Sequence, residues 1–199
     1  MKIRVRDDSV EIEGYVNAIE RLSKPLNSRI GKFTERIKKG AFKRAIERND
    51  NVHILLNHNW DKDLGSTKQG NLELNEDSIG LRAKAVINDR EVIDKARNGD
   101  LVGWSFGFAD RDVETHSEDG MTTRDVKDLD LYEVSILDRT RTPAYEGTMV
   151  SVRSDENIYH SSPLETEIEI RDESKPEEKH NDIDYSKAEN LINEMKGEN

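Results

Sequence analysis

The sequence contains no cysteine among its 199 residues. This absence excludes disulfide bridges, thiolate metal sites and a cysteine nucleophile, so any covalent catalysis must use oxygen or nitrogen atoms. Long hydrophobic runs are also missing. No stretch approaches the roughly 20 apolar residues that a membrane helix needs, and the first residues contain no apolar signal-peptide core. We therefore expect a soluble, intracellular protein with no membrane partner.

Basic residues are outnumbered, with 31 Lys and Arg against 42 Asp and Glu and a net charge of -11. Nucleic-acid binding requires clustered basic residues, and the one such cluster, residues 36–44, is short and typical of a solvated helix start. We expect no nucleic-acid partner. The acidic excess is concentrated in residues 151–199, which carry 14 acidic and 6 basic residues. We predict a globular domain over residues 1–150 and an acidic, largely disordered tail over residues 151–199, with a short helix at 185–195.

Short runs of alternating apolar residues dominate the predicted domain and indicate β-strands joined by tight turns. Hairpins are predicted around Asp7–Ser9, Asn75–Ser78 and Asp119–Gly120. Further strands are predicted at 52–56, 101–108, 129–137 and within 164–170, with a polar loop after Trp60, and short helices are predicted at 41–50 and 90–97. Because no βαβ alternation is present, the pattern favours a mainly antiparallel β fold of the α+β class.

A candidate nucleophile lies in the run Gly103-Trp104-Ser105-Phe106-Gly107. The run matches the G-x-S-x-G pattern that places a serine on a strand-to-helix turn in α/β-hydrolases. The same five residues are also compatible with a buried strand whose glycines relieve crowding against aromatic rings. The residues after Phe108 predict a hairpin instead of the helix that the α/β-hydrolase fold requires. The pattern therefore nominates Ser105 without assigning it to that fold.

Two histidines come from ordered elements of the predicted domain. His53 lies within a predicted strand, where a structural role is expected, whereas His58 lies at the strand end and can project into a cleft. His116 falls in a predicted hairpin, and His160 and His180 fall in the tail. His58 is therefore the candidate general base.

Four sequence blocks resemble the caudoviral prohead protease family, in the order that this family shows. They are F-T-E-R-I-K-K-G-A-F-K-R-A-I at residues 33–46, L-L-N-H-N-W-D-K-D-L-G-S at 55–66, L-V-G-W-S-F-G-F at 101–108 and L-Y-E-V-S-I-L-D-R-T-R-T-P-A-Y at 131–145. The resemblance covers about residues 10 to 150. It implies a fold related to herpesvirus assembly proteases: a closed or nearly closed β-barrel with a few peripheral helices.

The resemblance also implies a serine endopeptidase that trims scaffold and capsid-protein segments, and itself, inside the assembling procapsid in the host cytoplasm. Ser105 takes the place of the nucleophile and His58 that of the base, and no cofactor or metal is expected. Major capsid protein and scaffold segments are the expected partners, together with self-association. An oxyanion site is expected at the backbone of Arg141 and Thr142.

Glu133 is the candidate third catalytic residue, which would orient the imidazole. Asp130 and Asp138 flank it on the same predicted strand. Both differ from it by an odd number of positions, so strict alternation predicts that they lie on the opposite face.

Two other functions are compatible with parts of the sequence. A non-enzymatic capsid scaffold or assembly protein would use the acidic tail to engage basic capsid surfaces. A metal hydrolase would use His58, Asp61 and Asp63 as ligands, although no second ordered cluster completes the ligand set.

Overall fold

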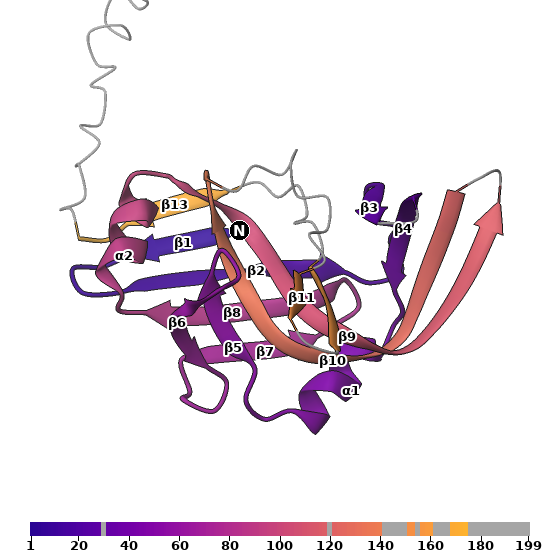
Figure 1. Ribbon diagram of the computed structural model, residues 1–199. Helices are drawn as coiled ribbons and strands as arrows, with labels where there is room; N and C mark the ends of the chain where they lie inside the picture. Colours follow the sequence, from indigo (N-terminus) through magenta and orange to yellow (C-terminus); the bar gives the residue numbers. More distant parts are fainter. Residues whose placement is uncertain (29–30, 119–120, 141–150, 154–155, 161–167, 175–199) are drawn as a thin grey trace, which may run out of the picture.

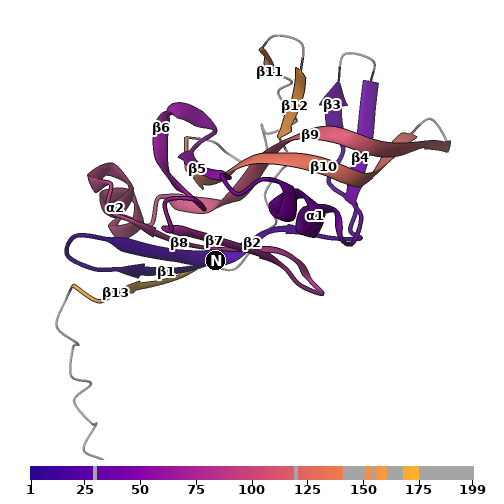
Figure 2. The same cartoon turned by 90° about the horizontal axis from the view of Figure 1, so that it is seen from below.

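The computed structural model describes residues 1–28, 31–118, 121–140, 151–153, 156–160 and 168–174. Its strands form two sheets, seen as separate layers in Figure 2. The five-stranded sheet has the order β13 (Glu169–Asp172), β1 (Lys2–Val5), β2 (Val10–Ala18), β8 (Gly80–Ile87) and β7 (Leu72–Glu76). The predicted hairpins β1–β2 and β7–β8 are both confirmed. On its other side, β1 pairs in parallel with β13.

The eight-stranded sheet is built around one long hairpin of 18-residue strands, β9 (Leu101–Glu118) and β10 (Met121–Asp138). The outer strands on the β9 side are β11 (Ser151–Arg153) and β12 (Glu156–His160). On the β10 side lie β3 (Leu26–Ser28), β4 (Gly31–Ile37), β5 (His53–Leu56) and β6 (Asn59–Ser66). Most pairs are antiparallel, as predicted, but β10 pairs in parallel with both β4 and β5.

The apolar core lies between the two sheets and includes both helices, α1 (Ala41–Arg48) and α2 (Arg90–Arg97), which were predicted from the sequence. Phe106 of β9 contributes most visibly: its ring stands edge-on to Phe42 of α1 at 5.1 Å and stacks on Phe108 at 5.2 Å. Such pairs stabilise the core beyond their buried area. The even-numbered residues of this part of β9 therefore face the core, and Ser105 faces the other way.

The closed or nearly closed barrel implied by the resemblance is not present in the part of the chain that the structure describes. There the strands form two open sheets, whose edge strands are β13 and β7 in one sheet and β11, β3 and β6 in the other. The sheets stay open because, among the described residues, no strand ladder joins the edge strands β13 and β7 to the eight-stranded sheet. Strand β10 also has register shifts on either side of Asp128 and again between Leu131 and Glu133. Bulges of this kind bend a strand and increase its twist. In Figure 1 the far half of the β9–β10 hairpin leaves the body as an arm beside β3 and β4.

Helix α1 covers the stretch of β10 that lies between its two parallel partners. Residues 122–126 of β10 pair with β4 and residues 133–136 with β5. Between them, α1 and the residue after it supply side-chain donors to β10 carbonyls: Arg44 to Lys127, Arg48 to Leu129 at 2.5 Å, and Asn49 to Leu131 at 2.8 Å. Side chains thus replace strand partners where the ladder is broken.

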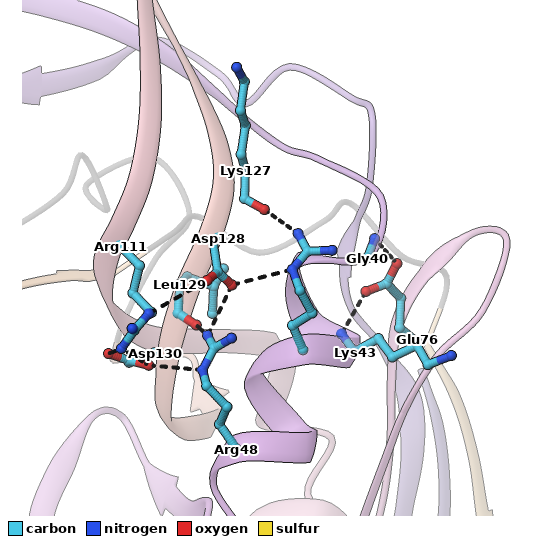
Figure 3. A network of polar contacts seen from close by, with 10 residues as sticks. Gly40, Lys43, Arg48, Glu76, Arg111, Lys127, Asp128, Leu129 and Asp130 are labelled. Atoms are coloured by element: carbon cyan, nitrogen blue, oxygen red, sulfur yellow. Dashed lines mark hydrogen bonds and ion pairs between the residues drawn. The ribbon is translucent and has the colours of Figure 1, made fainter.

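The acidic groups beside these carbonyls complete the network of Figure 3. Asp128 accepts from Arg48 at 2.9 Å, and Asp130 accepts from Arg111 of β9 at 3.0 Å. Because these charges tie α1 to both strands of the hairpin, they hold the bend in place and with it the direction of the strand segment that carries Glu133.

The N-terminus of α1 is capped from another sheet. Gly40 occupies the cap position and has no side chain, so the first amides of the helix need an outside acceptor. Glu76, at the end of β7, accepts from the backbone N–H of Gly40 at 2.6 Å and of Lys43 at 2.8 Å, as Figure 3 shows. Its negative charge also faces the positive end of the helix dipole.

We predict that Glu76→Ala lowers the free energy of unfolding by about 1 to 2 kcal/mol, because two helix amides lose their acceptor. Urea denaturation measures the change. Glu73→Ala is the matched control, since Glu73 is an exposed residue of the same strand, and its expected change is within about 0.5 kcal/mol. Equal losses in both variants would contradict the capping role.

Candidate active site

His58 lies in the tight turn that joins β5 to β6. Leu56 pairs with Asn59, so Asn57 and His58 are the two turn residues, and their φ angles are 57° and 58°. Two positive φ angles are the signature of a type I′ hairpin turn, for which asparagine is well suited. The polar loop predicted after Trp60 is therefore wrong: β6 runs from Asn59 to Ser66, because the turn reverses the chain within two residues.

Three hydrogen bonds, each with a main-chain group as at least one partner, hold this turn against β10. The N–H of Asn57 donates to the carbonyl of Ile136 at 2.9 Å, and the side-chain oxygen of Asn57 accepts from the N–H of Asp138 at 3.0 Å. The N–H of His58 donates to Oγ of Ser135 at 3.0 Å. A non-glycine residue at positive φ costs about 1 kcal/mol or more, so these contacts offset the strain of holding His58 in place.

Glu133 meets the imidazole of His58. Its Oε1 lies 2.7 Å from Nδ1 of the ring, and its Oε2 accepts from Oγ of Ser135 at 2.6 Å. Glu133 is 1% exposed, whereas the His58 side chain is 16% exposed. An ionised carboxylate at this distance accepts a hydrogen bond from Nδ1–H, so the neutral ring keeps its proton on Nδ1 and leaves Nε2 as a proton acceptor.

The expectation that Asp130 faces away from Glu133 is wrong. Asp130 pairs with Ala109 and Glu133 with Gly107, two positions apart on β9, so both acidic residues lie on one face. The extra residue is Tyr132, at the register shift, and such a bulge breaks strict alternation. Asp130 nevertheless pairs with Arg48 and Arg111, so the carboxylate bonded to His58 Nδ1 is that of Glu133.

Ser105 lies on β9 directly opposite Ser135 of β10. Residues paired in this way project from the same face of the sheet, about 4.5–5.5 Å apart at Cβ. Ser105, Ser135 and Glu133 therefore share the face that points away from the aromatic residues of β9, and Ser105 is 1% exposed. The structure thus brings His58 into contact with Glu133 and places Ser105 across the ladder from the serine that binds the His58 backbone.

Gly107 makes room for the carboxylate. A Cβ atom at this position would lie 2.4 Å from Oε1 of Glu133, closer than non-bonded atoms approach. The second glycine of the G-x-S-x-G run is therefore explained by the approach of Glu133. It does not produce a strand-to-helix turn, because β9 continues through Ser105 to Glu118 without interruption.

The expected oxyanion residues, Arg141 and Thr142, lie outside the described residues. The turn that precedes them is anchored at Asp138, whose side chain contacts Lys95 at 2.8 Å and accepts from the backbone N–H of Thr140 at 2.9 Å. Burial of Asp138 opposes its ionisation, but Lys95, Thr140 and Asn57 together lower its pKa to about 2. Asp138 is thus a charged anchor for both the turn at residues 139–140 and the turn that carries His58.

The metal-hydrolase alternative receives no support from these contacts. Asp63 lies 2.8 Å from Nδ1 of His53, and its other oxygen accepts from the N–H of Gly65. Asp61 is exposed. Within the described ranges, no group of three or more His, Asp or Glu residues is arranged to hold a metal ion.

Sequence reasoning missed three residues of the site: Asn57, Gly107 and Ser135. The signal in the sequence that could have identified Ser135 and Gly107 was their two-residue spacing from Glu133 and Ser105. Ser135 follows Glu133 by two positions, as Gly107 follows Ser105, and the antiparallel ladder places the two pairs opposite each other. This match becomes visible only when the register is known.

Comparison with known proteins decides the family. The family model of the caudovirus prohead serine protease matches residues 1–161. The chain belongs to this family. Membership indicates a serine protease of phage capsid maturation, in agreement with the resemblance found in the sequence. No curated protein and no solved structure matches the chain.

The match covers the whole of the predicted domain, residues 1–150, and ends at residue 161, just beyond β12. Strands β11, β12 and β13 fall within the segment predicted as a tail, whereas its predicted helix at 185–195 lies outside the described residues. No helix in the described ranges has the length and apolar character needed to cross a membrane.

We predict that Gly107→Ala lowers the free energy of unfolding by about 1 to 3 kcal/mol, because the added methyl group displaces the Glu133 carboxylate. Urea denaturation measures the loss. The same substitution in a Glu133→Ala background should cost less than about 0.5 kcal/mol, since the displaced group is then absent. An equal cost in both backgrounds would show that the methyl group clashes with something else.

Proposed function

We propose that this prohead protease is a serine endopeptidase in which Ser105 is the nucleophile, His58 the general base and Glu133 the residue that orients His58. The observation that carries the proposal is the 2.7 Å contact between Nδ1 of His58 and the buried Glu133. A non-enzymatic scaffold protein has no need for a buried carboxylate directed at a histidine that is held at positive φ. The family match supports the same conclusion.

The proposed reaction follows from the roles of these groups. Oγ of Ser105 attacks the scissile carbonyl carbon while Nε2 of His58 takes the hydroxyl proton, because a neutral serine is a weak nucleophile. The C–N bond of the tetrahedral intermediate then breaks, and the imidazolium returns the proton to the leaving amine. Water repeats both steps on the acyl-enzyme and releases the new carboxyl end. Glu133 keeps its negative charge throughout and stabilises the imidazolium.

The oxyanion of the intermediate needs hydrogen-bond donors, and one such donor contributes about 3 to 4 kcal/mol in other enzymes. We assign this role to the backbone of Arg141 and Thr142. The support is their position directly after the turn anchored by Asp138, whose N–H also binds Asn57 beside His58.

Segments of the major capsid protein and of the scaffold are the proposed substrates, met inside the procapsid in the cytoplasm of the infected host cell. Self-association and cleavage of the chain's own tail belong to the same proposal. The arrangement of β12 supports self-cleavage: it pairs antiparallel with β9, and His160 lies opposite Gly107, two residues from Ser105. An extended segment added to this strand edge resembles the way in which peptides bind by strand addition.

We predict that Ser105→Ala and His58→Ala each reduce cleavage of fluorescently labelled casein by at least about a thousandfold, because the residues act as a unit. Ser117→Ala, an exposed serine on the same strand, is the control and should retain full activity. Circular dichroism tests that the variants stay folded. Casein cleavage by folded Ser105→Ala at the unchanged rate would contradict the assignment.

For the tail, we predict that the purified active protein loses C-terminal residues on incubation, while Ser105→Ala retains its full mass. Intact-mass spectrometry over time measures the loss and gives the cleavage position. A full-length chain after prolonged incubation of protein that cleaves casein would argue against self-processing.

A further inference from the structure

We infer that Ser135 is a positioning residue of the catalytic site, which holds the backbone of His58 with one lone pair and the carboxylate of Glu133 with its proton. This inference rests on the proposed function, since positioning matters only if His58 acts as the base. Ser135 was not among the residues nominated from the sequence.

The contacts form a closed ring of three hydrogen bonds. The N–H of His58 donates to Oγ of Ser135 at 3.0 Å, and Oγ donates to Oε2 of Glu133 at 2.6 Å. The other oxygen of the same carboxylate meets Nδ1 of His58 at 2.7 Å. His58 is therefore held at both its main chain and its ring, and one serine links the two points. Loss of the serine hydroxyl removes one of the three hydrogen bonds that hold the turn and leaves one carboxylate oxygen without its donor.

Burial explains why a hydroxyl group here indicates a specific task. Ser135 is 0% exposed, and its neighbours in β10, Val134 and Ile136, are apolar core residues. A buried hydroxyl is costly unless it is hydrogen-bonded, so an apolar residue would suit a strand with a purely structural role. The donor and an acceptor site of Ser135 are both used within the ring that holds His58.

The same geometry separates the roles of two serines that face each other across the ladder. Ser135 directs its proton to Glu133 and accepts from the His58 backbone, so its hydroxyl is committed to the carboxylate and is not presented to the imidazole. Ser105, its partner on β9, is thus assigned as the nucleophile, and Ser135 as the residue that holds His58 and Glu133 in place.

Loss of the Ser135 hydroxyl should act on the rate of the chemical step more than on binding. His58 occupies a strained turn, and a displacement of about 1 Å in a catalytic group can cost about a hundredfold in rate. Outer residues that orient a metal-bound histidine through hydrogen bonds typically contribute 10–100-fold, which sets the scale expected for Ser135.

The test uses the full-length chain and a fluorophosphonate probe, which bonds to an activated serine hydroxyl with loss of fluoride and needs no known substrate. In Ser135→Ala, the maximal labelling rate should fall about 10–100-fold while the half-saturating probe concentration changes less than about twofold. Ser135→Thr, which keeps the hydroxyl, should recover most of the rate. Ser66→Ala is the control, because Ser66 is another buried serine whose hydroxyl accepts a backbone N–H.

A second readout does not depend on activity. Nuclear magnetic resonance of ¹⁵N-histidine-labelled protein should show the Nδ1-protonated form of His58 in the wild type and in Ser135→Thr. In Ser135→Ala a mixture of the two neutral tautomers is expected, because Glu133 is then free to turn away. An unchanged tautomer together with an unchanged labelling rate in Ser135→Ala would overturn the inference while leaving Ser105 as the nucleophile.

Two other outcomes are distinct from that one. Peptide mapping that finds the probe on Ser135 would make Ser135 the nucleophile and overturn the positioning role. A wild-type protein that is neither labelled nor able to cleave casein would remove the proposed function, and the catalytic part of the inference with it, whatever the resonance measurement shows about the ring of hydrogen bonds.

Discussion

The hydrogen bond between the buried Glu133 and Nδ1 of His58 is the contact on which the candidate site depends. A carboxylate shielded from solvent needs a hydrogen-bond donor at each oxygen. Glu133 has His58 at one oxygen and Ser135 at the other. Much of the surrounding structure serves this arrangement. Gly107 leaves the space that the carboxylate occupies, and Asp138 anchors the turn that carries the imidazole.

Strand β10 is the element that positions the residues of the candidate site. Its last third pairs with β9 on one side and with β5 on the other, so the strand that carries Ser105 and the strand that leads to His58 are its two neighbours. On the side away from β9, its middle third is held by side chains of α1 and by Asn49, where no second strand pairs with it. Its first third extends into the arm beside β4. The bulges between these thirds set the direction of each one. The helix, itself capped by Glu76 from the other sheet, therefore links the core to the geometry of the site.

Several elements could be predicted because local chemistry determines them. The hairpins around Asp7–Ser9 and Asn75–Ser78 combine turn residues with alternating strands, and both helices show apolar residues on one face. The strand β6 and the bulge at Tyr132 could not be predicted in this way. A type I′ turn formed by Asn57 and His58, and a register shift opposite Phe108, depend on contacts with β10 that lie far away in the chain. The parallel pairing of β10 with β4 and β5 is non-local for the same reason.

The sequence by itself determined the family and nominated Ser105, His58 and Glu133, because these residues occur in ordered motif blocks that can be read without a structure. Tertiary structure alone decided that Glu133 contacts His58 and that Ser105 lies across the ladder from Ser135. The pairing register placed Ser135 opposite Ser105 and Gly107 opposite Glu133. The bulge at Tyr132 placed Asp130 on the same face as Glu133, where strict alternation had predicted the opposite face. The register between two strands is determined by many weak contacts between segments that are distant in the chain. A shift of one residue moves every side chain of a strand to the other face of the sheet. No local pattern carries that information.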